Sequence, residues 1–182
     1  DGFDYFYQVN DDTQLNSLNW SEHLVDALRN SEPVPNFGVT GPRDSNNEQI
    51  FTHSFVHRTH IEAFGPLFPP SFKNWWSDDW ISTVYGEAYT FLLSNVQIRH
   101  NVEAQKTAGY TRYEVDKGAK LRLDDELKDG YLRINRWLRD NKYPTLPLPI
   151  ICNYIPLSRT LYEPLTTYRE NKRDKTVLEN VK

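Results

Sequence analysis

The segment at residues 3–9, FDYFYQV, constrains the fold most, because its apolar and aromatic side chains fall on both faces of an extended chain. A strand of this kind is typical of the middle of a sheet that is covered on both sides. Strand-like and helix-like segments then alternate along the rest of the chain. We therefore predict an α/β protein with a mixed sheet flanked by helices.

Further segments carry the periodicity of helices or strands. The predicted helices cover residues 22–30, 59–65, 78–87 and 121–141, and the predicted strands cover residues 37–42, 50–58 and 95–102. Ser21 and Ser77 precede the first and third helices and are expected to cap them, whereas Gly65 is expected to end the second. Gly130 lies inside the longest helix, where a glycine weakens the prediction.

The composition limits the classes of function. The chain has 182 residues, of which 38% are hydrophobic and 25% charged, as in a soluble globular domain. A net charge of −4 argues against broad electrostatic binding to nucleic acid, and the sequence contains no apolar run of about 18 residues that could span a membrane. Cys152 is the one cysteine, which excludes an internal disulfide and a cysteine-based zinc site. The compartment, secretory or cytoplasmic, stays open.

The first candidate site is the triplet Asn10, Asp11 and Asp12, which follows the opening strand directly. Open α/β sheets bind ligands beyond the carboxyl ends of their strands. Carboxylate oxygens at that place suit Mg²⁺ or Mn²⁺, which use one or two carboxylates together with substrate phosphates. Asn and Asp are also favoured in plain turns, because they hydrogen-bond their own backbone. On the triplet alone, the turn is the stronger interpretation.

The second candidate site is Asp78 and Asp79, at the predicted start of a helix and among Trp75, Trp76 and Trp80. Carboxylates are stabilised at a helix start, so this pair could serve structure alone. Aromatic side chains around a carboxyl group raise its pKa by desolvation and make it a better base near neutral pH. Tryptophan rings also offer flat faces to a sugar. The cluster fits an ordinary core and a sugar site about equally well.

Histidines supply a third candidate. His100 ends a predicted strand and could bind a metal through its neutral imidazole, although a structural role is the commoner one. His53, His57 and His60 lie on one strand and the helix after it. We expect these three to have structural or substrate-contact roles.

The order of these pieces is more specific than any one of them. A strand ends in an Asp-x-Asp-like triplet, HSFVHRTHIEAFGPLFP follows, a loop rich in proline and aromatic residues leads into WWSDDWISTVYG, and a later strand ends in histidine. This order resembles the nucleotide-diphospho-sugar glycosyltransferases of the GT-A fold. The resemblance covers roughly residues 3 to 100 and includes the run Val56-His57-Arg58, the Phe64-Gly65 helix end and the Asp78-Asp79 pair. It implies a GT-A-like, Rossmann-like mixed sheet.

The resemblance assigns a role to each candidate residue. Asn10-Asp11-Asp12 is similar to the Asp-x-Asp motif that binds the metal and the donor, with Asn10 in place of the first Asp. Asp12 is then the best metal ligand and Asp11 the next, and His100 completes the metal site. The implied metal is Mn²⁺ or Mg²⁺.

The acidic residues of the third helix resemble the pair that supplies the catalytic base in inverting members of the family. Asp79 is the favoured base, with Asp78 as the substitute. Trp75 and Trp76 would help to hold the donor or acceptor sugar. The implied partners are a nucleotide-sugar donor and a carbohydrate or glycoconjugate acceptor.

The family's domain begins with a nucleotide-binding βαβ unit that precedes the metal strand, and this sequence starts at the metal strand. We expect that unit to lie upstream in a longer protein. Residues 1–143 would then be the catalytic part, and residues 144–182 an extended arm and tail. Two alternatives stay open: a metal-dependent hydrolase, either a glycosidase or a phosphatase, and a non-catalytic carbohydrate-binding module that uses the tryptophan cluster.

Overall fold

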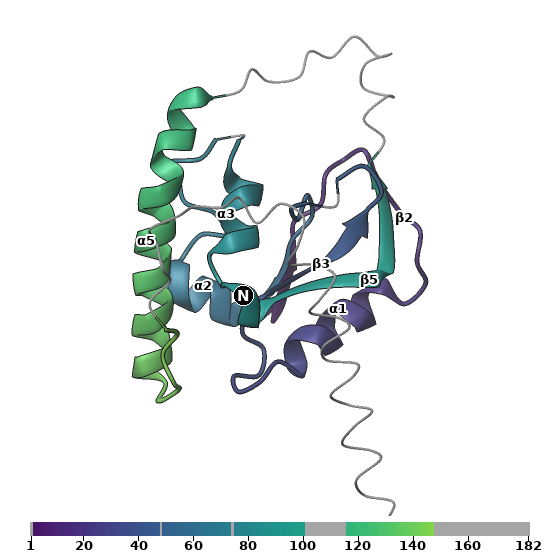
Figure 1. The fold of residues 1–182 in the computed structure, drawn as a ribbon. Coiled ribbons are helices and arrows are strands. Elements are labelled where there is room, and N and C mark those ends of the chain that lie inside the picture. The colour runs from purple at the N-terminus through teal and green to yellow at the C-terminus, as the bar shows by residue number, and fades with distance from the viewer. Residues whose placement is uncertain (1, 48, 74, 101–115, 148–182) are drawn as a thin grey trace, which may run out of the picture.

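The protein is a mixed α/β structure in which helices cover both faces of a curled, five-stranded sheet (Figure 1). The computed structural model describes residues 2–47, 49–73, 75–100 and 116–147. The strands are β1 (Tyr5–Tyr7), β2 (Thr13–Leu15), β3 (Val39–Asp44), β4 (Phe55–His57) and β5 (Thr90–His100). The helices are α1 (Trp20–Arg29), α2 (Arg58–Phe64), α3 (Ser77–Thr83) and α5 (Lys117–Asp140), with the short 3₁₀ helix η1 (Glu87–Tyr89).

The strand directions bring three strand ends together. The strand order is β1-β4-β3-β5-β2, where β3 and β5 are parallel and the other neighbours are antiparallel. Because β4 runs against both β1 and β3, the strands β1, β3 and β5 all point the same way. We call the place where these three strands finish the carboxyl end of the sheet. It is the end at which open α/β sheets bind ligands.

The opening strand differs from its prediction. Among the described strands, β1 pairs with β4 alone, so it lies at an edge of the sheet and not in the middle. Its residues are nevertheless covered on both faces, since Tyr5 and Tyr7 pack beside α1 while Phe6 packs on the larger core. A strand that is apolar on both faces is covered on both faces, and in this protein the coverage includes the edge strand β1.

Two helix starts also differ from their predictions. Asn19 precedes α1 and Trp76 precedes α3, each with a left-handed backbone (φ 54° and 75°) and without a side-chain capping hydrogen bond. Ser21 and Ser77 therefore lie inside the first turns and do not cap them. The predicted strand at residues 50–58 shortens to β4, whereas α2 does end before Gly65 and the strand predicted at 37–42 is present as β3.

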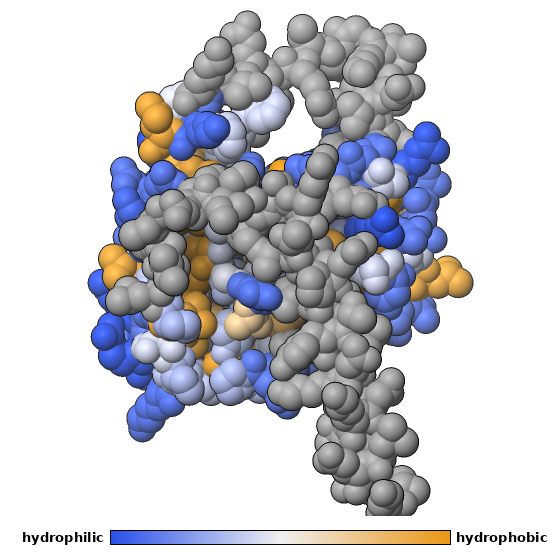
Figure 2. Space-filling view, in the orientation of Figure 1, coloured by the Kyte–Doolittle hydropathy of each residue, from blue (hydrophilic) through white to orange (hydrophobic). Residues whose placement is uncertain are grey.

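The core has two parts, one on each face of the sheet. Leu24 and Leu28 of α1 pack with Phe55 on one face. The larger part lies on the other face, where α2, α3 and α5 pack together. On the surface seen in Figure 2 the described residues are mostly hydrophilic, and the apolar ones stand in separate groups. No helix in the described ranges is long and apolar enough to cross a membrane.

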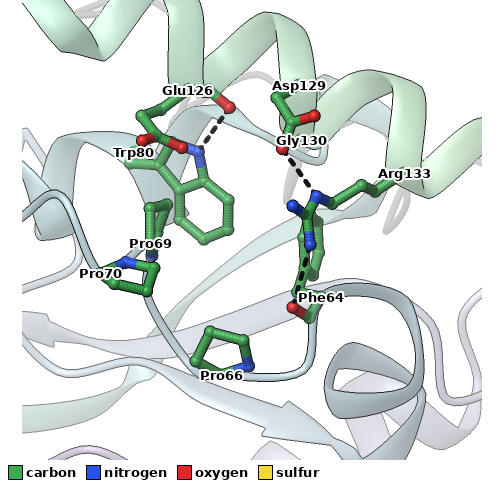
Figure 3. Close-up of a pocket in the computed structure, with 9 residues that line it drawn as sticks. All are labelled: Phe64, Pro66, Pro69, Pro70, Trp80, Glu126, Asp129, Gly130 and Arg133. Atoms are coloured by element: carbon green, nitrogen blue, oxygen red, sulfur yellow. Dashed lines mark hydrogen bonds and ion pairs between the residues drawn. The ribbon is translucent and has the colours of Figure 1, made fainter.

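Gly130, in the middle of α5, has a packing role. A Cβ atom there would lie 2.5 Å from Val84 Cγ2 and 3.3 Å from Trp80 Cζ2, so only glycine lets α5 approach α3 this closely. The Trp80 indole N–H donates to the Glu126 carbonyl of α5 at 3.1 Å. Figure 3 shows Trp80 and Gly130 in the wall of a cavity of about 160 Å³, which α5, Phe64 and three prolines also line. Neither acidic candidate site lines this cavity.

Candidate functional site

The segment from Asn10 to Thr13, which we call the acidic turn, joins β1 to β2 at the carboxyl end of the sheet. The Thr13 amide donates to the Asn10 carbonyl at 3.3 Å, and Gln8 Nε2 donates to Asn10 Oδ1 at 3.0 Å. The turn that the sequence predicted is therefore present. Asp11 is exposed, whereas both carboxylate oxygens of Asp12 are shielded from solvent.

The acidic turn leads directly into the pairing of β2 with β5. Thr13 lies opposite His100 in this antiparallel pair, so the backbones of Asp12 and His100 are brought to the same place. The His100 side chain lies outside the part of the chain that the structure describes, and its metal-ligand role stays a prediction.

Asp78 and Asp79, which we call the acidic pair, lie in the first turn of α3 and are both partly buried. Desolvation, followed by the charge of Asp79, raises the pKa of Asp78 to about 7. Desolvation also raises the pKa of Asp79, while its own backbone amide and Lys120 of α5 act in the opposite direction. Asp79 therefore ionises more readily than its neighbour, which is the property that a general base needs.

Hydrogen bonds join the backbone of α3 to the loop before β4 and to the end of β3. Ser82 of α3 donates to the Asp78 carbonyl at 2.6 Å and accepts from the Phe51 amide at 2.9 Å. The next residue, Thr52, donates to Asp44 Oδ2 at 2.7 Å, and Asp44 is the last residue of β3. These bonds join the backbone of α3 to the end of β3 and do not place the carboxylates of the acidic pair. That Asp12 and Asp79 face one another across a cleft stays a prediction.

The three tryptophans near the acidic pair have different environments. Trp80 is a core residue with 1% of its surface exposed. Trp76 donates its indole N–H to the Asp116 carbonyl at 3.1 Å, and Lys120 Nζ lies 5.5 Å from the centre of its ring. Trp75 is partly exposed, and its indole N–H, which is shielded from solvent, has no hydrogen-bond partner among the described residues.

Two of the remaining histidines make structural contacts. His57 Nδ1 accepts from the Thr59 amide at 3.2 Å and so caps α2. His60 is fully buried, and burial lowers its pKa to about 4. Its Nε2 donates to the Leu67 carbonyl at 3.0 Å, and its Nδ1 accepts from the Tyr85 hydroxyl at 2.8 Å.

Sequence reasoning missed a polar cluster beside the acidic turn. Asp44 and His53, with 2% and 1% of their surface exposed, are joined through Thr52, and His53 also contacts Thr13. The sequence carried no signal of this cluster, because its contacts join segments that are separate in the sequence.

The acidic turn offers two carboxylates that suit a hard metal ion. Mg²⁺ commonly takes one or two carboxylates and completes its coordination with phosphate oxygens and water. Asp11 and Asp12 supply that donor set. In the described ranges, no group of three or more His, Cys, Asp or Glu side chains is placed to hold a metal.

Comparisons with known proteins give no match: no family model, no curated protein and no solved structure is similar to this chain. The site is therefore interpreted from its own geometry.

The raised pKa of Asp78 predicts how stability depends on pH. The folded protein holds this proton more tightly than the unfolded chain, whose aspartate has a pKa near 3.8. Ionised Asp78 therefore destabilises the folded protein. This destabilisation is fully present above about pH 7, shrinks as the pH falls from 7 to 4, and is absent at lower pH. Asp78→Asn should therefore raise the free energy of unfolding by about 2–4 kcal/mol at pH 8 and hardly at pH 4.

Urea unfolding of the wild type and of Asp78→Asn at both pH values measures this difference. Asp125→Asn, at a carboxylate that is 82% exposed, is the control and should change little at either pH. An equal gain at pH 4 and pH 8 would contradict the assignment.

Proposed function

We propose that this chain is the catalytic part of a metal-dependent glycosyltransferase that moves a sugar from a nucleotide-diphosphate sugar to an acceptor hydroxyl. The observation that carries the proposal is that one domain combines two different acidic groups, the acidic turn after β1 and the acidic pair in α3. One is a turn with hard oxygen donors, and the other is a desolvated pair with a raised pKa. Transfer from a nucleotide sugar needs both, since it requires charge neutralisation at the diphosphate and a base at the acceptor.

The acidic pair would supply the base. Asp79 takes the proton of the acceptor hydroxyl, whose oxygen then attacks the anomeric carbon. The bond from that carbon to the diphosphate breaks, and the diphosphate leaves with the electron pair. Attack from the face opposite the diphosphate inverts the anomeric configuration. Asp78, which holds its proton up to about pH 7, keeps a second negative charge away from Asp79 at lower pH.

The acidic turn would hold the donor end of the reaction. Asp12, supported by Asp11 and His100, would bind Mn²⁺ or Mg²⁺, which when bound neutralises charge on the departing diphosphate. Asn10, the first residue of the acidic turn, would lie beside the bound donor. Trp75 and Trp76 would hold a sugar ring and exclude water from the reacting carbon. A GT-A fold completes the proposal.

The experiment is an assay of nucleoside diphosphate release. The chain is incubated with a panel of nucleotide sugars and Mn²⁺, with and without acceptor saccharides, and with EDTA as the metal-free control. We expect release that needs both Mn²⁺ and an acceptor. Release of free sugar or phosphate from simple glycosides or phosphate esters would point to a hydrolase. Metal-independent sugar binding that survives Asp12→Ala, without any release, would point to a binding module.

A further inference from the structure

A buried hydrogen-bonded chain reaches the acidic turn from the end of β3. Asp44 Oδ1 accepts from the Asn46 amide at 2.9 Å, and Asp44 Oδ2 accepts from the Thr52 hydroxyl at 2.7 Å. Thr52 Oγ1 lies 2.8 Å from His53 Nδ1, and His53 Nε2 is hydrogen-bonded to Thr13 Oγ1. The chain therefore joins three separate segments of the protein, at residues 44, 52–53 and 13.

The direction of each hydrogen bond follows from the number of protons available. The carboxylate of Asp44 only accepts, so the single hydroxyl proton of Thr52 goes to Asp44. Thr52 must then accept from His53 Nδ1–H. In the neutral imidazole this leaves Nε2 as an acceptor, and Thr13 donates its hydroxyl proton to it. The orientation of the His53 ring is fixed from one side by Thr52 and from the other by Thr13.

The backbone around His53 leaves little room for this ring to move. A Cβ atom on Gly41 of β3 would lie 2.6 Å from the His53 carbonyl and 2.6 Å from Phe51 Cδ1, so the segment 51–53 lies directly against β3. His53 is also 1% exposed. Thr13, in contrast, is half-buried and starts a strand of only three residues. The packing around His53 holds its ring in place. We therefore expect the hydrogen bond between His53 and Thr13 to order Thr13.

We propose that Thr13 and His53 are positioning residues that hold the acidic turn, and through it the Asp12 carboxylate, in the geometry that binds the metal. Thr13 closes the turn with its amide and is adjacent to Asp12, so a fixed Thr13 side chain fixes the end of the turn. The metal part of this inference rests on the proposed function. The ordering of the turn does not, because its contacts lie within the protein itself. Residues that orient metal ligands commonly change metal affinity by about 10–100-fold when they are replaced.

Thr13→Val tests the inference, because valine keeps the branched shape and removes the hydroxyl. Thr13→Ser keeps the hydroxyl and is the rescue variant. Thr90→Val is the matched control, since the Thr90 hydroxyl donates to the Gly86 carbonyl at the opposite end of β5. Hydrogen exchange of the amides of residues 11–13 is measured without metal, and Mn²⁺ affinity is measured with inorganic pyrophosphate present. Asp12→Asn reports separately on the metal site.

We expect Thr13→Val to exchange these amides faster than the wild type and to bind Mn²⁺ about 10-fold more weakly. Thr13→Ser and Thr90→Val should match the wild type in both measurements. If Thr13→Val does not fold, His53→Phe removes both ring nitrogens at similar volume and should give the same changes. Unchanged exchange and affinity in Thr13→Val, with binding lost in Asp12→Asn, would overturn the positioning role alone. Unchanged Mn²⁺ binding in Asp12→Asn would overturn the proposed metal site, and the exchange rates would still decide whether Thr13 orders the turn.

Discussion

Asp79→Asn should lower kcat for sugar transfer by about 10²–10⁴-fold, which is the usual contribution of a general base. Asparagine keeps the shape of the side chain and its place on α3, but it cannot accept a proton from the acceptor hydroxyl. Binding of the donor should change little, so KM for the nucleotide sugar should stay near the wild-type value. Initial rates of nucleoside diphosphate release at pH 7.5 or so, with varied donor and acceptor, measure both quantities.

Two controls sharpen this result. Asp125→Asn removes an exposed carboxylate from α5 and should leave the rate unchanged. Asp78→Asn should cost less than Asp79→Asn and should leave the acidic limb of the pH–rate profile in place, because the charge of Asp79 raises the pKa of Asp78, so that Asp79 ionises first. A variant Asp79→Asn with full activity would remove the base from this proposal.

Trp80→Ala should lower the free energy of unfolding by about 3–5 kcal/mol, as truncations of large buried aromatic side chains do. Trp80 is 1% exposed, and its ring centroid lies 5.1 Å from that of Phe64. Its indole N–H also holds α3 against α5 at Glu126. Since the free energy of unfolding of a typical domain is only about 5–15 kcal/mol, this loss of stability would be severe. Thermal and urea unfolding provide the measurement.

The matched control is Trp75→Ala, at a partly exposed tryptophan five residues earlier in the sequence. It should cost clearly less stability than Trp80→Ala, while weakening the binding of donor or acceptor if Trp75 contacts a sugar. Equal losses of stability in both variants would contradict the assignment of Trp80 as the residue that joins α3 to α5.

The helices were predictable where their pattern was long or their boundary was marked. The helical spacing of Leu121, Leu127, Tyr131, Ile134 and Leu138 predicted α5, and the helix is confirmed in spite of Gly130, although Leu121 is 81% exposed and Leu123 is buried instead. The glycine is explained only by its neighbours Trp80 and Val84, which come from a distant part of the sequence. Helix propensity predicts that a glycine destabilises a helix, but packing against neighbouring residues can outweigh this effect.

The place of β1 in the sheet was not predictable from its residues. Tyr5, Phe6 and Tyr7 are covered on both faces, which the sequence indicated, but strand neighbours are set by backbone pairing that leaves no mark in side-chain polarity. The helix starts failed for a different reason. A serine before a helix is one way to begin it, and the left-handed backbone at Asn19 and Trp76 is another.

The acidic groups of the site were visible in the sequence, while the structure that supports them was not. Asp11 and Asp12 stand out because they end an apolar segment, and Asp78 and Asp79 because they interrupt one. The place of the acidic turn in the sheet depends on strand directions, which follow from pairing. The contact of Thr13 with His53 spans 40 positions of sequence and needs the folded chain.

The central claim is that the acidic turn and the acidic pair form one site, and paramagnetic broadening by Mn²⁺ tests it most directly. Backbone amide signals are recorded with Mn²⁺ and inorganic pyrophosphate, with Mg²⁺ as the diamagnetic reference and Asp12→Asn as the control. The account predicts that Mn²⁺ broadens the signals of both Asp12 and Asp79, and that Asp12→Asn abolishes the broadening at both. Broadening confined to the acidic turn, with the signals of α3 unchanged, would contradict it.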